Sequence, residues 1–255
     1  NAGSNGKFVA VLDLALDKGK VKDARYHLLP VYSELLKPDP AMAELIGKLR
    51  APHVTDWSEK IATPDRLLYR RGNFSGPMDQ VICSALRHEL DAEIALSPGF
   101  RWGTTAPAGQ PMTMEDLLAE TAITYPETYV QEMTGGQIKD VLEDVCDNLF
   151  NPDPYYQQGG DMVRVGGLQY SCNPLAGMGK RIDNMRLNGK LIEADKSYKV
   201  AGWAPVAEEA KSAGNKLVWD VVETWLKARG GKVAPRKLNM PKVEGVLPNP
   251  GYAAL

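Results

Sequence analysis

Apolar positions along the chain predict a β-hairpin followed by a longer region in which helices and strands alternate. The pattern of residues 7–16 is typical of a strand and so is that of residues 21–31, with a glycine-containing turn at 18–20 between them. Two such segments around a short turn predict two antiparallel strands. Because an isolated two-stranded hairpin is only marginally stable, we expect this one to dock on a larger sheet, so that the chain begins inside a fold.

Helical periodicity and capping residues indicate the later elements. Asp39 and Pro40 suit the start of a helix that Pro52 interrupts or ends. The proline-rich tail beyond residue 230 is expected to run extended along the surface. Together, the predicted helices and strands indicate a mixed α/β (α+β) fold, with the main domain starting near residue 60. The remaining expected elements are helices at 77–90, 113 onward, 137–150 and 218–227, and strands at 93–96, 129–133, 162–168, 185–187 and 198–203.

Charge and composition exclude several classes of function. The formal net charge is −2 and the cationic residues form no stripe, so we expect no nucleic-acid partner. No apolar run is long enough to span a membrane. The three histidines lack the spacing of a zinc site, and no nucleophile elbow occurs. Cys83 and Cys146 lie in apolar helical patterns and are expected to be buried, whereas Cys172 is expected in a loop as an exposed, inert thiol.

The strongest local signal is the segment 97–103, which follows a short apolar run. Here a Pro-Gly pair is followed by Arg101 and Trp102. The planar guanidinium of arginine matches a tetrahedral oxyanion such as phosphate, sulfate or a thiosulfonate. A surface turn in which Arg101 lies over Trp102, or a structural ion pair, is the alternative.

Six short motifs occur in the order found in one protein family. The chain resembles the C-terminal domain of the 5'-nucleotidase family, and that resemblance implies the fold of this domain. The motifs are Ser84-Ala85-Leu86-Arg87, Pro98-Gly99-Phe100-Arg101, the helix start at 109–116, the helix start at 133–143, Val165-Gly166-Gly167-Leu168, and the hairpin from Arg181-Ile182 through Asn188-Gly189-Lys190 to Tyr198-Lys199-Val200.

The opening residues resemble the last strands of the metallophosphoesterase domain that precedes this domain in the family. The resemblance implies a terminal hairpin of that domain at 1–36, a linker helix at 37–62 and a substrate-recognition domain at 63–255. It also implies that two manganese ions lie in an N-terminal domain, and that this chain alone holds no metal and is inactive. Residues 1–6 carry no signal-peptide pattern.

Two departures from nucleotidases concern the pair of aromatic side chains that stack the base. Met162, or Val163 in the neighbouring register, replaces one, and residues 201–205 lack the glycine-rich loop near the other. With residues 99–103 and 155–161, these departures resemble the SoxB branch, the thiosulfohydrolases of bacterial sulfur oxidation. That resemblance implies a periplasmic hydrolase releasing sulfate from a cysteine S-thiosulfonate on a carrier protein of the SoxYZ type.

The same resemblance assigns the candidate site. Arg101 is expected to be catalytic, binding the sulfonate oxygens. Arg87 is expected to be solvated or ion-paired, and Tyr170 structural. For the loop around residue 158 an ordinary connection is the alternative. The whole chain has two alternatives as well, the substrate domain of a nucleotidase or other phosphoesterase and a non-catalytic protein-binding module. The expected substrate-binding residues are Trp102, Gly103, Tyr155, Tyr156, Gly159, Gly160, Asp161 and Arg164.

Overall fold

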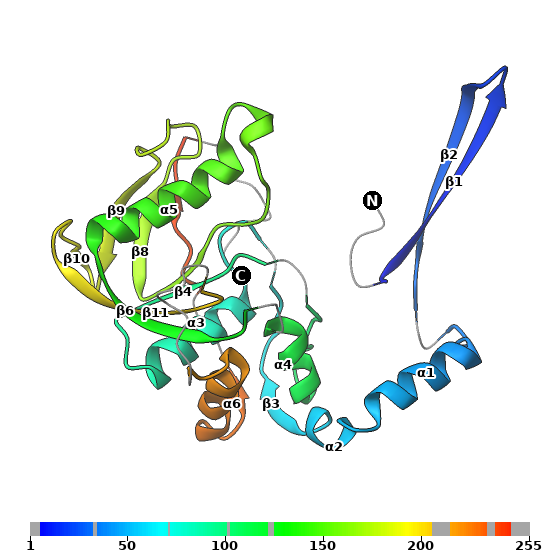
Figure 1. Ribbon diagram of the computed structural model, residues 1–255, viewed down its shortest axis with the longest axis horizontal. Helices are drawn as coiled ribbons and strands as arrows, with labels where there is room; N and C mark the ends of the chain where they lie inside the picture. The colour runs from blue at the N-terminus through cyan, green and yellow to red at the C-terminus, as the bar shows by residue number, and fades with distance from the viewer. Residues whose placement is uncertain are drawn as a thin grey trace. The chain divides into compact units, whose positions relative to one another are not determined.

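The computed structural model divides into two compact units, Asn1–Ser58 and Glu59–Leu255. It combines helices with several small sheets, which confirms the predicted mixed α/β class (Figure 1). None of the helices in the described ranges is both long enough and apolar enough to cross a membrane. The structure describes residues 6–32, 35–70, 72–100, 103–121, 125–205, 215–233 and 238–245.

The first unit contains the predicted hairpin and helix. Strand β1 (Phe8–Asp17) pairs antiparallel with β2 (Lys20–Pro30), and Lys18 and Gly19 turn the chain with φ angles of 48° and 77°. Helix α1 (Pro40–Arg50) begins after Asp39, whose carboxylate accepts a hydrogen bond of 2.8 Å from the Met42 amide. A short helix α2 (Val54–Trp57) follows. The sequence therefore predicted both the strands and the helix start.

One face of the hairpin is entirely apolar. The strand register places alternate residues of the two strands on this face, and it puts Asp13 opposite Arg25 on the other face. Every residue of the apolar face is exposed. Nothing in the described part of the first unit covers it, so within this unit the hairpin lacks the packing that stabilises a sheet. The apolar residues are Phe8, Ala10, Leu12, Leu14, Ala24, Tyr26, Leu28 and Pro30.

We expect the backbone amides of the hairpin to exchange rapidly with solvent deuterium in the dilute 255-residue chain. An uncovered two-stranded sheet opens at little free-energy cost, whereas helix α3 (Pro77–Glu89) in the second unit is largely buried and should stay protected. Hydrogen exchange followed by mass spectrometry measures both segments in one sample. Protection of residues 8–30 equal to that of α3 would contradict this expectation.

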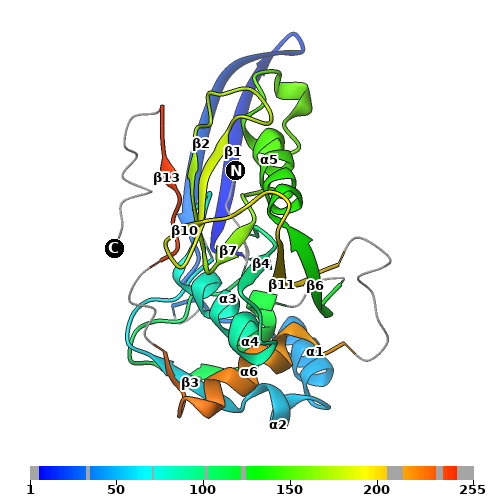
Figure 2. The ribbon, with the colours of Figure 1, turned by 90° about the vertical axis from the view of Figure 1, so that its left-hand side faces the viewer.

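The second unit is built around a central sheet of four strands in the order β6-β11-β4-β7. β11 runs parallel to β4 and antiparallel to β6, and β7 runs antiparallel to β4. Both views show α3, α4 and α6 on one side of this sheet and α5 on the other (Figures 1 and 2). The strands are β6 (Thr128–Thr134), β11 (Ser197–Trp203), β4 (Ile94–Ser97) and β7 (Arg164–Gly166), and the two further helices on the α3 side are α4 (Met114–Thr121) and α6 (Val218–Ala228).

Alternation along the central strands supplies two apolar cores. Ala95 of β4 faces the first core, formed with α3 and α6, whereas Ile94 and Leu96 face the second core, formed with α5. β11 repeats the pattern, since Ala201 belongs to the first core and Val200 to the second. The central sheet is therefore covered on both faces. A small sheet beside the first core contains β12 (Lys232–Val233), β3 (Lys60–Pro64) and β5 (Met112–Thr113).

The second core lies between helix α5 and another four-stranded sheet. Thr134 and Gln137 cap the helix reciprocally, with hydrogen bonds of 2.8 and 3.2 Å. Gly167, with a φ of 83°, follows β7 and redirects the chain into this second sheet. The strand predicted at 162–168 is therefore confirmed only over Arg164–Gly166, and Leu168 already belongs to the next strand. The elements are α5 (Gly135–Phe150), β8 (Leu168–Cys172), β9 (Ile182–Leu187), β10 (Lys190–Leu191) and β13 (Lys242–Val243).

Two further expectations need correction. Cys172 is the last residue of β8 and is fully buried rather than exposed in a loop, because the strand continues past Tyr170 and packs under α5. Cys83 and Cys146 are buried, as predicted. The tail beyond residue 230 is not merely a surface segment, since two short pieces of it pair with β3 and β8 and bury Val233. Pairing partners so distant in sequence leave no local pattern.

Candidate functional site

The candidate loop begins where β4 leaves the central sheet. Pro98, Gly99, Phe100 and Gly103 belong to the described residues, whereas Arg101 and Trp102 lie outside them. The Pro98 carbonyl accepts a hydrogen bond of 2.7 Å from Nη2 of Arg70, a side chain that the sequence analysis did not single out. The entry to the loop is thus fixed by a buried arginine.

Phe100 anchors the loop in the first core. Its ring lies 6.0 Å from the ring of Trp203, edge to face, and the Arg70 guanidinium carbon lies 5.5 Å from the centroid of the Phe100 ring. The Trp203 indole donates a hydrogen bond of 2.7 Å to the Ser97 hydroxyl at the end of β4. These contacts hold the backbone immediately before Arg101 against the sheet.

Gly99 brings two predicted segments of the site together. A Cβ atom at this position would collide with the backbone carbonyl oxygens of Asp161 and Met162. The loop that carries Arg101 and the segment that carries Asp161 are therefore in backbone contact. This close approach requires a residue without a side chain.

We expect Gly99→Ala to destabilise the chain by about 1–3 kcal/mol, because the methyl group must push apart two packed backbones. Gly177→Ala is the matched control, since a Cβ atom there would meet nothing within 4 Å. Urea unfolding of both variants measures the difference. Equal midpoints for Gly99→Ala and the unmutated chain would show that the two segments are not held in contact.

A buried ion cluster contacts both of these segments. It consists of Arg70, Asp79, Arg164 and Asp161. Arg70 Nε donates to Asp79 Oδ1 at 2.7 Å, and Arg164 Nη2 donates to Asp161 Oδ2 at 2.9 Å. Arg164 Nε lies 3.3 Å from Asp79 Oδ2, which joins the two pairs. All four side chains have no exposed surface. The two positive and two negative charges balance, as burial requires.

The ion cluster positions both candidate segments at once. Arg70 also donates to the Glu120 carbonyl at 2.8 Å, which ties the cluster to α4. Asp161 and Arg164, two of the predicted substrate-binding residues, are held by the cluster. Arg164 Nη1 has no hydrogen-bond acceptor among the described residues, and its contact with substrate stays a prediction.

Gly103, the first described residue after Arg101 and Trp102, lies close to the acidic side chain of Glu120. Its φ is 109°, and a Cβ atom there would lie 2.5 Å from Oε2 of Glu120. Glu120 itself is buried in α4. The described residues on both sides of Arg101 and Trp102 therefore lie against the fold. Pro98, before them, contacts Arg70, and Gly103, after them, lies against Glu120 of α4.

The second predicted segment is an exposed aromatic loop. Tyr155 and Tyr156 form a 3₁₀ turn (Pro154–Tyr156) and are 95% and 66% exposed. Gly159 and Gly160 follow with φ angles of 81° and 87°, in the left-handed region that favours glycine. Two tyrosine rings thus stand in solvent on a turn whose far end, Asp161, is buried in the ion cluster.

Sequence reasoning missed Arg70, Asp79 and Glu120. Asp79 offered a signal, because a carboxylate among the apolar residues of an otherwise buried helix requires a partner. Its neighbour Cys83 is no nucleophile at neutral pH, since burial, together with the charge of Asp79, raises the pKa of the thiol to about 12.

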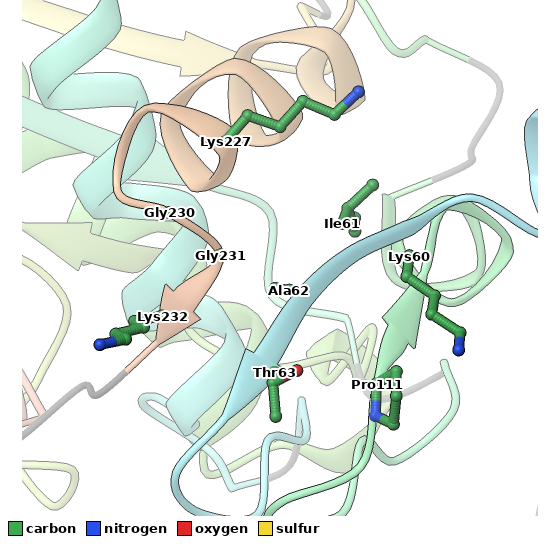
Figure 3. Close-up of a pocket in the computed structure, with 9 residues that line it drawn as sticks. All are labelled: Lys60, Ile61, Ala62, Thr63, Pro111, Lys227, Gly230, Gly231 and Lys232. Carbon is green, nitrogen blue, oxygen red and sulfur yellow. The ribbon is translucent and has the colours of Figure 1, made fainter.

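A separate pocket of about 490 Å³ lies at the end of α6. It contains none of the predicted site residues. Lys60, Lys227 and Lys232 line it, but their amino groups point in different directions (Figure 3). Nζ of Lys227 is held by Glu59 at 2.6 Å and Glu223 at 2.8 Å. These lysines do not converge on a common ligand.

The resemblance implies that the two manganese ions lie in an N-terminal domain, outside this chain. Within the described ranges, no three side chains of histidine, cysteine, aspartate or glutamate come together as a metal site. The ion cluster pairs its two carboxylates with arginines, which leaves them unsuited to a cation. No role in metal binding is assigned to residues of this chain.

The fold and the anchored loop correspond to one family. Residues 60–212 match the family described as 5'-nucleotidase, C-terminal domain. The chain belongs to this family. No curated protein sequence gives a significant match.

Among solved structures, the chain is similar to the sulfate thiohydrolase SoxB of Thermus thermophilus in complex with glycerol, with 34% identity, a TM-score of 0.88, and coverage of 95% of this chain and 45% of that one. A 5'-nucleotidase precursor from Thermus thermophilus has 17% identity and a TM-score of 0.74, covering 95% and 51%. A putative 5'-nucleotidase from Staphylococcus aureus has 16% identity and a TM-score of 0.62, covering 94% and 51%. The chain thus spans only about half of these proteins, and the latter two show the fold alone.

Proposed function

We propose that the chain is the substrate-binding part of a thiosulfohydrolase, which releases sulfate from a cysteine S-thiosulfonate on a carrier protein. The observation that carries the proposal is the likeness to a sulfate thiohydrolase, at 34% identity over 95% of the chain. The nucleotidase with the same coverage of this chain is only 17% identical.

Burial of two side chains supports this choice over a nucleotidase. Met162, where nucleotidases of the family carry a stacking aromatic residue, has no exposed surface. Trp203, near the position of the other aromatic residue, is 2% exposed and lies against Phe100 and Arg70. Neither side chain offers a face to a nucleobase, whereas a peptide arm needs no such clamp.

In this proposal the anchored loop presents Arg101 to the sulfonate oxygens, where its charge stabilises the negative charge that develops during hydrolysis. Trp102, Gly103 and the exposed tyrosines line the path of the carrier arm, and Gly159 and Gly160 let its backbone approach closely. No residue of this chain would hold a metal in this proposal; a metallophosphoesterase domain with two manganese ions would supply the activated water. The proposed location is the periplasm, with a carrier of the SoxYZ type as partner.

The test is product release by the full-length gene product in manganese-containing buffer. One sample receives a Gly-Gly-Cys-Gly peptide carrying an S-thiosulfonate, and a second receives AMP. The proposal predicts sulfate release at least about 100-fold faster than phosphate release, a difference of about 2.7 kcal/mol in barrier height. Faster phosphate release would identify a nucleotidase, and release of neither product would favour the non-catalytic binding module.

A further inference from the structure

Two thiols meet in the second core, away from the ion cluster. Cys146 on α5 and Cys172 at the end of β8 have their sulfur atoms 3.5 Å apart. Both side chains are fully buried. The third cysteine, Cys83, lies in the first core, on the other side of the central sheet. Of the three thiols, only Cys146 and Cys172 are therefore neighbours.

We propose that Cys146 and Cys172 are an oxidation site that forms an intramolecular disulfide. The sulfur atoms already touch, so a bond of about 2.05 Å requires a shift of roughly 1.5 Å between α5 and β8. No assignment of function depends on this cross-link, and it is independent of the proposed hydrolase activity.

The reaction is a thiol–disulfide exchange with an oxidant that itself carries a disulfide. The thiolate of Cys172 attacks one sulfur of the oxidant, forming a mixed disulfide and releasing one thiolate of the oxidant. The thiolate of Cys146 then attacks the sulfur of Cys172 in the mixed disulfide, which forms the Cys146–Cys172 bond and releases the second thiolate of the oxidant. Two protons leave the cysteines and two electrons reduce the oxidant, so atoms and charge balance.

In the folded chain the hydrogen bond between the two sulfur atoms lowers the pKa of Cys172 and, together with burial, raises the pKa of Cys146. Because both sulfur atoms are shielded from solvent, the oxidant reaches them while the chain folds or when α5 opens locally, and reacts slowly with the folded chain.

The cross-link would tie together the two ends of a segment that carries candidate site residues. The cysteines are 26 positions apart, and the residues between them include the exposed Tyr155 and Tyr156 as well as Asp161 and Arg164. Closing this loop restricts the unfolded chain and so stabilises the folded one. The disulfide would therefore stabilise the folded form of the segment that carries the aromatic loop and part of the ion cluster.

The test folds the denatured, reduced chain in a buffer of oxidised and reduced glutathione and counts thiols that alkylate under denaturing conditions. We expect one alkylated cysteine, Cys83, and a proteolytic fragment in which Cys146 and Cys172 are linked. After reduction three cysteines should alkylate, and the melting temperature of the oxidised chain should lie roughly 5–10 °C above that of the reduced one.

Variants separate this disulfide from other oxidation. Cys83→Ser should keep the linked fragment and the rise in melting temperature, whereas Cys146→Ala and Cys172→Ala should lose both. The mass measurement on the unmutated chain decides the matter even if a variant fails to fold. Three alkylated cysteines after oxidative folding, or a link that includes Cys83, would overturn the proposal.

Discussion

Asp79→Asn is expected to lower the stability of the chain by about 3–5 kcal/mol and its melting temperature by roughly 10 °C. Asp79 is the carboxylate shared by Arg70 and Arg164, and all three side chains lack exposed surface. Removing its charge leaves the buried ion cluster with two positive charges and one negative charge. Water cannot compensate this imbalance, so the cost is that of an unpaired buried ion.

Asp91→Asn is the matched control. Asp91 forms an ion pair of 3.0 Å with Lys199, but its side chain is 99% exposed, so this variant should stay within about 0.5 kcal/mol of the unmutated chain. Thermal and urea unfolding measure both variants. If Asp79→Asn were as stable as Asp91→Asn, the ion cluster would not be the element that holds the candidate loop.

Arg101→Ala is expected to weaken binding of an S-thiosulfonate peptide roughly 10- to 100-fold, the loss that follows when a charged donor to an anion is removed. Stability should change little, because the described contacts that anchor the loop come from Pro98, Phe100 and Gly103. Calorimetric titration measures the affinity. Arg101→Lys should keep part of it, since a lysine retains the charge and loses the planar fork.

Arg229→Ala serves as the control for charge alone. Arg229 lies over the Trp225 ring at the end of α6, 4.7 Å from its centroid. Its removal should leave peptide affinity unchanged. An equal loss of affinity in Arg229→Ala and Arg101→Ala would point to general electrostatic attraction and would contradict a specific role for Arg101.

The helices and most strands were predictable because their signals are local. Helix α5 combines a periodic apolar face with a cap formed by Thr134 and Gln137, so one short stretch of sequence contains both its body and its start. The hairpin was equally clear, because its turn lies between two segments whose patterns are typical of strands.

The ion cluster and the cysteine pair were not predictable for the opposite reason. Arg70 precedes α3, Asp79 belongs to it, and Arg164 comes from β7, so only the fold brings their charges together. Cys172 was expected to be exposed because the segment that contains it was predicted to be a loop. Its burial depends on α5, which packs over β8 and precedes it in the chain, and this packing has no local pattern of its own in the sequence.

The most direct test of the proposed substrate class is a side-by-side titration of the 255-residue chain with two ligands. One is a Gly-Gly-Cys-Gly peptide carrying an S-thiosulfonate, and the other is AMP. We predict that the peptide binds at least about tenfold more tightly than AMP, a difference of about 1.4 kcal/mol in binding free energy. Tighter binding of AMP would contradict the proposal and would identify the chain as the substrate domain of a nucleotidase.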